Sequence, residues 1–287
     1  MGEKSDWDRG FDAGYDRGFT AGKEEAYQKN GQKYNVIFDR GFRDGWNYRD
    51  FEKEECKEIH TGKIPNRQLA EIIREALIKR DPLSVIVLGD GEALTLAQDL
   101  ILTEEEIRWR GPFLAYAGVE IPDLIARDRL ANAIRLADYV GPTNSFGANF
   151  QPLLLKAFRK HGIDFRKLQI CSPFFNYELF ASGALQDIIL NTNPKPNVLL
   201  IGNRALELRR ALAPTGLNLV EPVSPVNGVR DVERVMTEVT KGGFDLALVS
   251  AGVATSIICV QIAEQLGKVA LKFGHLADWL IRGNAKW

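Results

Sequence analysis

The sequence predicts an α/β protein with a Rossmann-like, mostly parallel sheet that is covered by helices on both faces. Short apolar runs rich in β-branched residues recur between residues 65 and 287. Stretches with the periodicity of amphipathic helices lie between most of these runs. The runs are apolar throughout, with no alternation of polar residues, as expected for strands that helices cover on both faces. These observations together predict the fold class.

The expected elements follow one another in a regular order. The first is a helix with one apolar face, formed by Leu69, Ile72, Ile73, Ala76 and Leu77. Further helices are expected at 121–137, 150–160, 229–241 and 256–266. Strands are expected at 84–88, 113–116, 168–171, 197–201, 217–220, 245–249 and 268–273. Ligands of such sheets bind beyond the carboxyl ends of the strands, so functional residues are sought there.

Residues 1–62 differ in composition and are interpreted as a helical extension, with the α/β domain at 63–287. The first 60 residues contain eleven aromatic residues and no leucine, and Asp-Arg-Gly-Phe occurs three times. Aromatic residues and glycines recur every four positions, which places each set near one face of a helix. We expect two short helices joined near Asn30-Gly31 that mediate a homo-oligomer or docking. The alternative is a repetitive tail.

The charge, the apolar runs and the cysteines of the chain disfavour several classes of protein. The 287 residues carry a formal net charge of −1, which gives no global electrostatic case for nucleic acid or an anionic membrane as partner. No run reaches the roughly 18 apolar residues of a membrane span, and the charged N-terminus does not resemble a secretory signal. Cys56, Cys171 and Cys259 lack metal-type spacing and favour reduced thiols. A cytoplasmic location is therefore expected.

The strand at 84–88 runs directly into Gly89-Asp90-Gly91-Glu92. The glycines permit a tight turn, and the two carboxylates come close together with no basic neighbour in the sequence. A divalent cation would relieve their repulsion and could bridge a diphosphate. The alternative is a polar turn in which Asp90 caps the helix beginning near Glu92. A dinucleotide fingerprint is disfavoured because Leu94 stands where its third glycine belongs.

Small and polar residues also follow the other strands. Each turn alone is more often a plain connection, but four of them on one sheet edge favour a phosphate-rich ligand. His275 follows Phe273-Gly274 at the last strand end and is a candidate catalytic group, because imidazole titrates near neutral pH. The candidate donor-binding residues are Gly89, Gly91, Thr143, Asn144, Asn176, Gly202, Asn203, Arg204, Ser250 and Gly252.

The strand that leads into Gly89-Asp90-Gly91-Glu92 resembles the signature of the GT-D-type glycosyltransferases, and segments at 175–179, 198–202, 245–252 and 269–275 fit in order. The resemblance covers about residues 65–281. It implies a Rossmann-like fold, a nucleotide-sugar donor and a divalent metal held by Asp90 and Glu92. One departure stands out. The family often has an acidic residue before Phe/Ile-Gly-His near the end, where this chain has Lys272.

The expected activity is transfer of a hexose from a UDP-sugar or similar donor to a glycan or glycoprotein. Mn²⁺ or Mg²⁺ would neutralise charge on the departing nucleoside diphosphate, and Asp90, Glu92 and His275 are the expected catalytic residues. A competing interpretation is a non-catalytic nucleotide-binding or assembly protein with a degenerate Rossmann-like domain. Another interpretation is a Rossmann-type methyltransferase or dehydrogenase. The absence of the third glycine of the dinucleotide fingerprint disfavours it.

Overall fold

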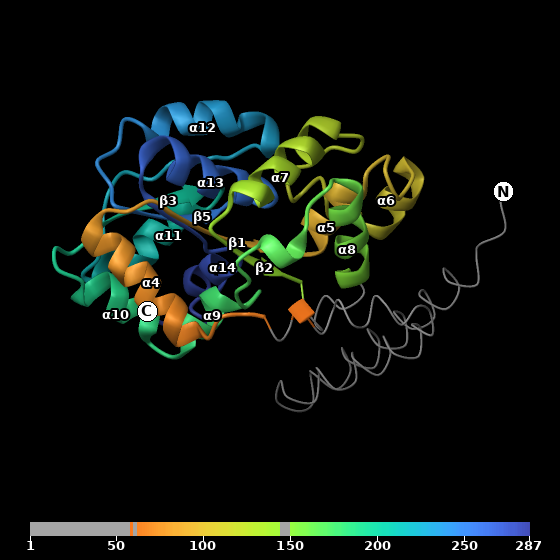
Figure 1. Ribbon diagram of the computed structural model, residues 1–287. Coiled ribbons are helices and arrows are strands. Elements are labelled where there is room, and N and C mark those ends of the chain that lie inside the picture. The colour runs from red at the N-terminus through yellow and green to blue at the C-terminus, as the bar shows by residue number, and fades with distance from the viewer. Residues whose placement is uncertain (1–57, 60–61, 144–149) are drawn as a thin grey trace, which may run out of the picture.

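The computed structural model describes residues 58–59, 62–143 and 150–287, and in these residues a single parallel sheet lies between two helical layers (Figure 1). The sheet has six strands in the order β2-β1-β6-β5-β3-β4, and every pairing is parallel. The predicted fold class is therefore confirmed. The strands are β1 (Leu83–Leu88), β2 (Tyr139–Pro142), β3 (Asn197–Gly202), β4 (Asn218–Leu219), β5 (Leu246–Ser250) and β6 (Val269–Lys272).

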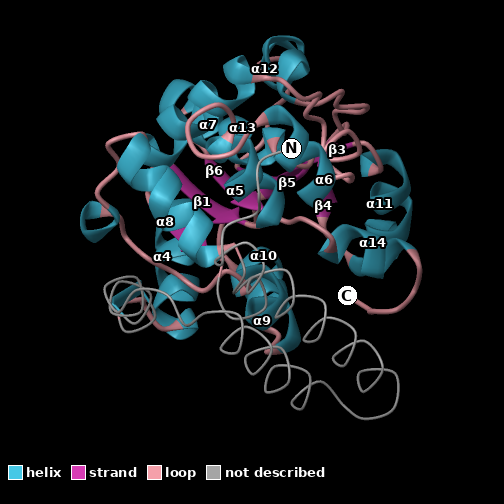
Figure 2. Cartoon of the chain, turned by 90° about the vertical axis from the view of Figure 1, so that its right-hand side faces the viewer, coloured by secondary structure: helices cyan, strands magenta, loops and turns pink. Residues whose placement is uncertain are grey.

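Helices bury an apolar core on each face of the sheet, and the two layers are seen from the side in Figure 2. One core is covered by α5 (Asp90–Ala97), α6 (Glu104–Arg110), α7 (Leu124–Leu136), α8 (Gln151–Lys160), α12 (Val232–Val239) and α13 (Ala254–Leu266). The other is covered by α4 (Asn66–Lys79), α9 (Phe175–Ala181), α10 (Ala184–Asn191), α11 (Ala205–Leu212) and α14 (Leu276–Ile281). Single turns of 3₁₀-helix lie at Phe165–Lys167, Ala213–Thr215 and Val229–Asp231.

Most predicted elements are present, with three differences at strands. The segment 113–116 forms hydrogen-bonded turns, because Leu114 N donates to Gly111 O and Ala117 N to Phe113 O. The segment 168–171 makes only a single bridge, from Ile170 to Val140. Conversely, the stretch from Tyr139 to Pro142 is itself the edge strand β2, although its glycine and proline are typical of a turn.

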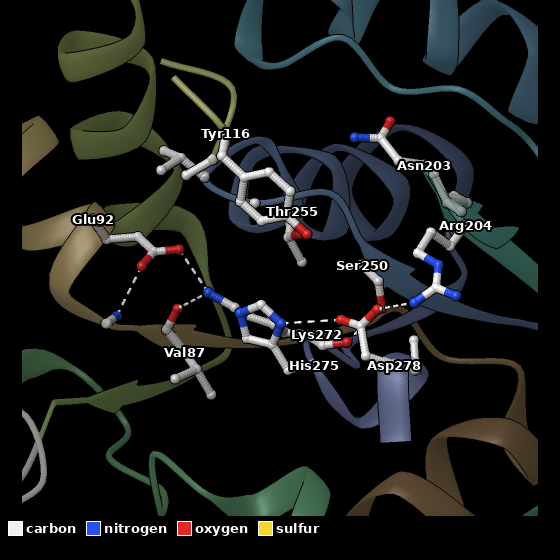
Figure 3. Close-up of a pocket in the computed structure, with 18 of the residues that line it drawn as sticks. Val87, Glu92, Tyr116, Asn203, Arg204, Ser250, Thr255, Lys272, His275 and Asp278 are labelled. Carbon is white, nitrogen blue, oxygen red and sulfur yellow. Dashed lines mark hydrogen bonds and ion pairs between the residues drawn. The ribbon is translucent and has the colours of Figure 1, made fainter. Parts of the chain in front are cut away.

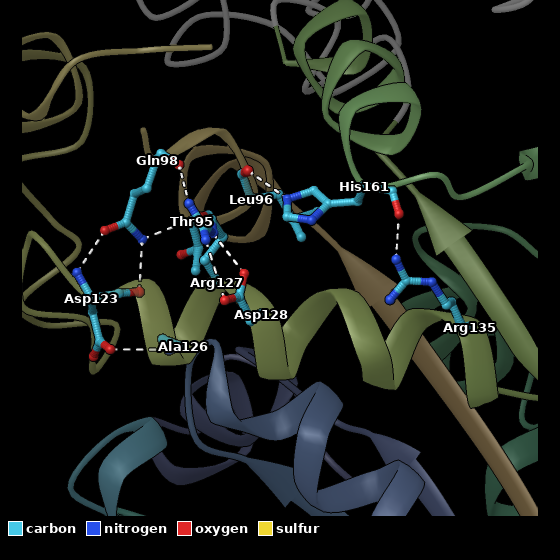
Figure 4. A network of polar contacts seen from close by, with 9 residues as sticks. All are labelled: Thr95, Leu96, Gln98, Asp123, Ala126, Arg127, Asp128, Arg135 and His161. Carbon is cyan, nitrogen blue, oxygen red and sulfur yellow. Dashed lines mark hydrogen bonds and ion pairs between the residues drawn. The ribbon is translucent and has the colours of Figure 1, made fainter. Parts of the chain in front are cut away.

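A buried polar network fixes α5 against α7 (Figure 4). The Gln98 side chain donates to the carbonyls of Thr95 and Asp123 and accepts from Asp123 N at 2.7 Å. Asp123 caps α7 by accepting from Ala126 N, and Arg127 donates to the Gln98 carbonyl. The network thus anchors the C-terminal end of α5, the helix whose first turn carries the candidate carboxylates.

The aromatic and glycine repeats of the predicted extension lie outside the described residues, so their helices stay a prediction. The last residues before the predicted boundary contact the α/β domain. Ile59 is buried in the core that α5 and α8 help to cover, and Glu58 pairs with Arg166 at 3.0 Å. Across residues 58–59, 62–143 and 150–287, no helix combines the length and apolar character that a bilayer crossing needs.

Candidate active site

A cavity of about 510 Å³ opens at the carboxyl edge of the sheet (Figure 3). Its walls are the ends of β1, β3, β5 and β6 together with the turns that follow these strands. The cavity therefore lies at the edge of the sheet where ligand binding was predicted. The predicted residues that line it are Gly89, Asp90, Gly91, Glu92, Asn203, Arg204, Ser250, Gly252 and His275.

Three predicted residues do not line this cavity, and Asn144 lies outside the described residues. Thr143 is buried next to the edge strand β2, away from the central strands that form the walls. Asn176 is buried and donates to the Phe273 carbonyl at 2.8 Å, so it supports the turn that carries His275. Gly202 packs against β5, where a Cβ would stand 2.2 Å from the Ser250 carbonyl oxygen.

Glu92 is buried and has a basic partner that its sequence neighbourhood does not reveal. Its Oε1 lies 2.6 Å from Lys272 Nζ, and its Oε2 accepts from Gly89 N at 2.8 Å. The side chains of Glu92 and Lys272 are 6% and 15% exposed. The expectation of two carboxylates without a basic neighbour is therefore wrong, and Glu92, not Asp90, accepts a hydrogen bond from the residue preceding α5.

Asp90 has a different environment. Its Oδ1 accepts from Gly91 N at 2.8 Å, and its side chain reaches solvent at the cavity. The surrounding walls still exclude much of the water near the carboxyl group. This desolvation raises the pKa of Asp90, the Gly91 hydrogen bond opposes the shift, and the negative charge of Glu92 adds to it. Asp90 is thus the carboxylate of the pair that a ligand can reach.

The folded Asp-x-Glu pair does not fit a divalent ion. Both oxygens of Glu92 are engaged, one by the Lys272 ammonium and the other by the Gly89 amide. Of the two carboxylates, only Asp90 is exposed at the cavity. Among residues 58–59, 62–143 and 150–287, no group of three or more His, Cys, Asp and Glu side chains could hold a metal. A metal site at Asp90 and Glu92 stays a prediction that needs rearrangement.

The opposite wall carries a chain of three polar side chains. His275 Nδ1 lies 3.1 Å from Asp278 Oδ2, and Arg204 Nη1 lies 2.6 Å from Asp278 Oδ1. Burial by itself raises the pKa of Asp278, but hydrogen bonds from His275 and Arg204 outweigh it and leave the pKa lowered. Arg204 also pairs with Glu207 at 2.6 Å, so a phosphate would compete with two carboxylates for its guanidinium.

A turn between α6 and α7 covers part of the cavity. Its Ala117 carbonyl accepts from Val253 N at 3.1 Å. Gly252 has φ +57°, and a Cβ there would stand 2.3 Å from the Ala117 oxygen, so only glycine allows this approach. Tyr116 lines the cavity with 80% of its surface exposed, and Figure 3 shows its ring among the lining residues. Sequence reasoning missed Tyr116 because it assigned this turn to a strand.

Two further lining residues were missed as functional candidates. Lys272 was noted only as a departure from the resemblance, although a lysine that ends an otherwise apolar strand faces the carboxyl edge and its cavity. Asp278 stands three residues after His275 on the first turn of α14, a spacing at which helical side chains meet. That spacing was a usable signal for Asp278.

A family model described as a GT-D fold-like domain matches residues 64–280. The chain belongs to the GT-D-like family. The sequence resemblance is confirmed, and its span agrees with the matched residues. No curated protein matches the chain.

Solved structures share the fold of this chain. One, described as the selenomethionine-substituted structure of domain of unknown function 1792, has a TM-score of 0.56 at 15% identity and covers 81% of this chain and 86% of its own. Another, described as a new glycosyltransferase of this domain type from Streptococcus sanguinis, has a TM-score of 0.51 at 15% identity, with 77% and 85% covered. A third, described as a distinct glycosyltransferase fold, has a TM-score of 0.53 at 15% identity, with 81% and 86% covered. At this identity the likeness establishes the fold.

Proposed function

We propose that this protein is a glycosyltransferase that moves a hexose from a nucleoside diphosphate sugar, with UDP as the expected nucleotide, to a hydroxyl group of a glycan or glycoprotein. Membership of the GT-D-like family supports glycosyl transfer as the reaction class. One observation carries the proposal. A single cavity at the carboxyl edge of the sheet brings together Asp90, Lys272 and the His275–Asp278 pair.

The size and lining of the cavity support a donor of this kind. Its volume of about 510 Å³ falls in the range of small-molecule sites. Lys272 supplies positive charge at the cavity for phosphate oxygens. The exposed ring of Tyr116 offers an apolar face on which a nucleobase can stack. These features support a site with the diphosphate at the sheet edge and the base against Tyr116.

The reaction needs stabilisation of the charge that builds on the departing diphosphate and removal of a proton from the acceptor hydroxyl. His275 is the proposed base, because Asp278 orients its ring and the side chain is 74% exposed to an arriving acceptor. Asp90 is proposed to contact the transferred sugar or the acceptor hydroxyl from the opposite wall. If Mn²⁺ or Mg²⁺ binds, it would neutralise diphosphate charge, but binding between Asp90 and Glu92 requires Glu92 to release Lys272.

The proposed function is tested by incubating the protein with UDP-, GDP-, ADP- and CDP-hexoses and measuring nucleoside diphosphate release. We expect one nucleotide class to be turned over, faster when the acceptor is present, and turnover to fall in Asp90→Asn. The assay is run once with EDTA and once with Mn²⁺, so that turnover is detected whether or not the reaction needs a metal. Absence of binding and of release with every donor in both conditions would falsify the proposal.

Self-association through the predicted extension at 1–62 and a cytoplasmic location are further parts of the proposal. The aromatic and glycine repeats support the first, because an aromatic stripe left in water is unusual for a monomer. Light scattering compares the full chain with a chain that starts at Glu58 and so keeps Ile59 in the core. We expect the full chain to form the larger assembly, and equal numbers of subunits in the two would contradict it.

A further inference from the structure

We propose that the Lys272 ammonium takes the place of a divalent ion in this protein and binds the donor diphosphate directly, so that donor binding needs no metal. This inference rests on the proposed function and names the cation that its donor site uses. It follows from the ion pair that Lys272 forms with Glu92, one of the two predicted metal ligands.

The position of Lys272 suits this role. It ends β6, which lies between β1 and β5 near the middle of the sheet, and its side chain lines the cavity. Its Nζ donates to Glu92 Oε1 at 2.6 Å and to the Val87 carbonyl at 2.8 Å. The two contacts come from β1 and the first turn of α5, so the ammonium is fixed beside the carboxyl end of β1 (Figure 3).

The ammonium also keeps a donor available. A protonated lysine has three N–H groups, and the hydrogen bonds to Glu92 and Val87 use two of them. Among the described residues no partner for the third is present. Because Lys272 lines the cavity, a diphosphate oxygen can accept this remaining hydrogen bond in a charge-assisted contact.

The Glu92 carboxylate needs one cation and cannot easily share two. A carboxylate as buried as Glu92 needs a compensating charge, and Lys272 supplies it. An ion bound to the same carboxylate would stand within about 4 Å of the ammonium, where repulsion in a partly desolvated site is strong. The lysine and a divalent ion are therefore alternatives at this position.

Calorimetry tests the inference with the full-length protein and UDP, GDP, ADP and CDP, once in EDTA and once with Mn²⁺. We expect one nucleotide to bind with the same affinity in both conditions. Lys272→Gln should weaken its binding by about tenfold or more, as expected for loss of a hydrogen bond to a charged group. The matched control is Lys268→Gln, which removes a half-buried lysine outside the cavity, before the other end of β6, and should change nothing.

Because Lys272→Gln leaves Glu92 without its cation, the double variant Glu92→Gln/Lys272→Gln is measured as well. It removes both charges of the pair and should also lose binding in EDTA. Nucleotide binding by the wild type only in the presence of Mn²⁺ would overturn the lysine inference and leave the proposed function standing. Unchanged binding in a folded double variant would overturn it too.

A Mn²⁺ titration followed by electron paramagnetic resonance separates the two proposals. Without nucleotide, we expect the wild type not to retain Mn²⁺, while Lys272→Asp, which restores an acid at this position, does retain it. If no nucleotide binds in any condition, the proposed function fails, and diphosphate binding by Lys272 fails with it. In that case the titration still tests whether Lys272 excludes a metal ion from Glu92. Mn²⁺ retained by the wild type would contradict this exclusion.

Discussion

The two walls of the cavity hold their charges in different ways. On one wall, Glu92 and Lys272 form a buried pair whose side chains are 6% and 15% exposed. On the other, Arg204, Asp278 and His275 form an open chain with exposures of 33%, 20% and 74%. A buried pair is held in one geometry by the cost of separating it, whereas exposed pairs contribute little and can exchange partners. The first wall is therefore preorganised, and the second can respond to a ligand.

This difference suits the two substrates of a transferase. A fixed ammonium in a water-poor corner stabilises charge on a leaving group without rearranging during the reaction. An exposed histidine can meet acceptors of varied shape while Asp278 keeps its ring oriented. We therefore propose that the donor diphosphate binds at the Lys272 wall and the acceptor at the His275 wall.

Breaking the buried pair should have the largest effect on stability. Lys272→Met leaves Glu92 charged without a partner, and we expect the free energy of unfolding to fall by about 3 kcal/mol or more. Glu92→Gln/Lys272→Met should recover most of this loss, because it removes the uncompensated charge. Urea unfolding measures both, with Lys268→Met, at the other end of β6, as the control. A single variant as stable as the control would show that the pair is not a buried, coupled unit.

Removing the reachable carboxylate should affect turnover more than stability. Asp90→Asn keeps the shape of the side chain and an oxygen that can accept from Gly91 N. We expect the rate of transfer to fall about a hundredfold, the typical cost of losing one group that acts in the transition state. Steady-state kinetics on a variant with wild-type Tm checks this. Wild-type turnover would remove Asp90 from the mechanism.

Removing the exposed aromatic ring should weaken donor binding while leaving the charged side chains of the cavity unchanged. Tyr116→Ala is expected to raise the Kd of the nucleoside diphosphate about tenfold, in line with the loss of a stacked base. Tyr116→Phe keeps the ring and should bind as the wild type does. Calorimetry distinguishes the two variants. An equal loss in both would mean that the hydroxyl, and not the ring face, contacts the nucleotide.

The two aspartates should affect stability with opposite signs. The pKa of Asp278 is lowered, so its carboxylate stabilises the fold above the ordinary aspartate pKa of about 4, and this contribution is lost as pH falls through the lowered value. The pKa of Asp90 is raised, so its charged form disfavours the fold at neutral pH, and that penalty disappears in acid.

Unfolding of Asp278→Asn and Asp90→Asn is therefore compared between neutral pH and about pH 3. At neutral pH we expect the first variant to be less stable than the wild type and the second more stable. Both differences should shrink in acid. Two variants that shift stability in the same direction at neutral pH would show that the walls do not differ electrostatically in this way.

The sequence was sufficient where the signal is local. The apolar runs predicted β1, β3, β5 and β6, and the residues after them were expected to share one edge because parallel strands end together. Asp90 and Glu92 follow β1 directly, so their place at the cavity could be predicted.

Contacts between distant segments could not be predicted in the same way. Lys272 lies 180 residues from Glu92 in the chain, and only the pairing of β6 with β1 brings them together. The position of Tyr116 at the cavity depends on the close approach of the Ala117 backbone to Gly252, and no local sequence pattern indicates this approach. Thr143 was misplaced for a related reason, since the edge position of β2 depends on strand order and not on composition.

A crystal structure of the protein with its nucleoside diphosphate, grown in EDTA, tests the position of the donor most directly. We expect the diphosphate at the carboxyl edge of the sheet, within hydrogen-bonding distance of Lys272 Nζ, with the base against the Tyr116 ring. His275 should face the open side of the cavity. A nucleotide bound elsewhere, or a diphosphate turned away from Lys272, would contradict the central claim that this cavity is the donor site.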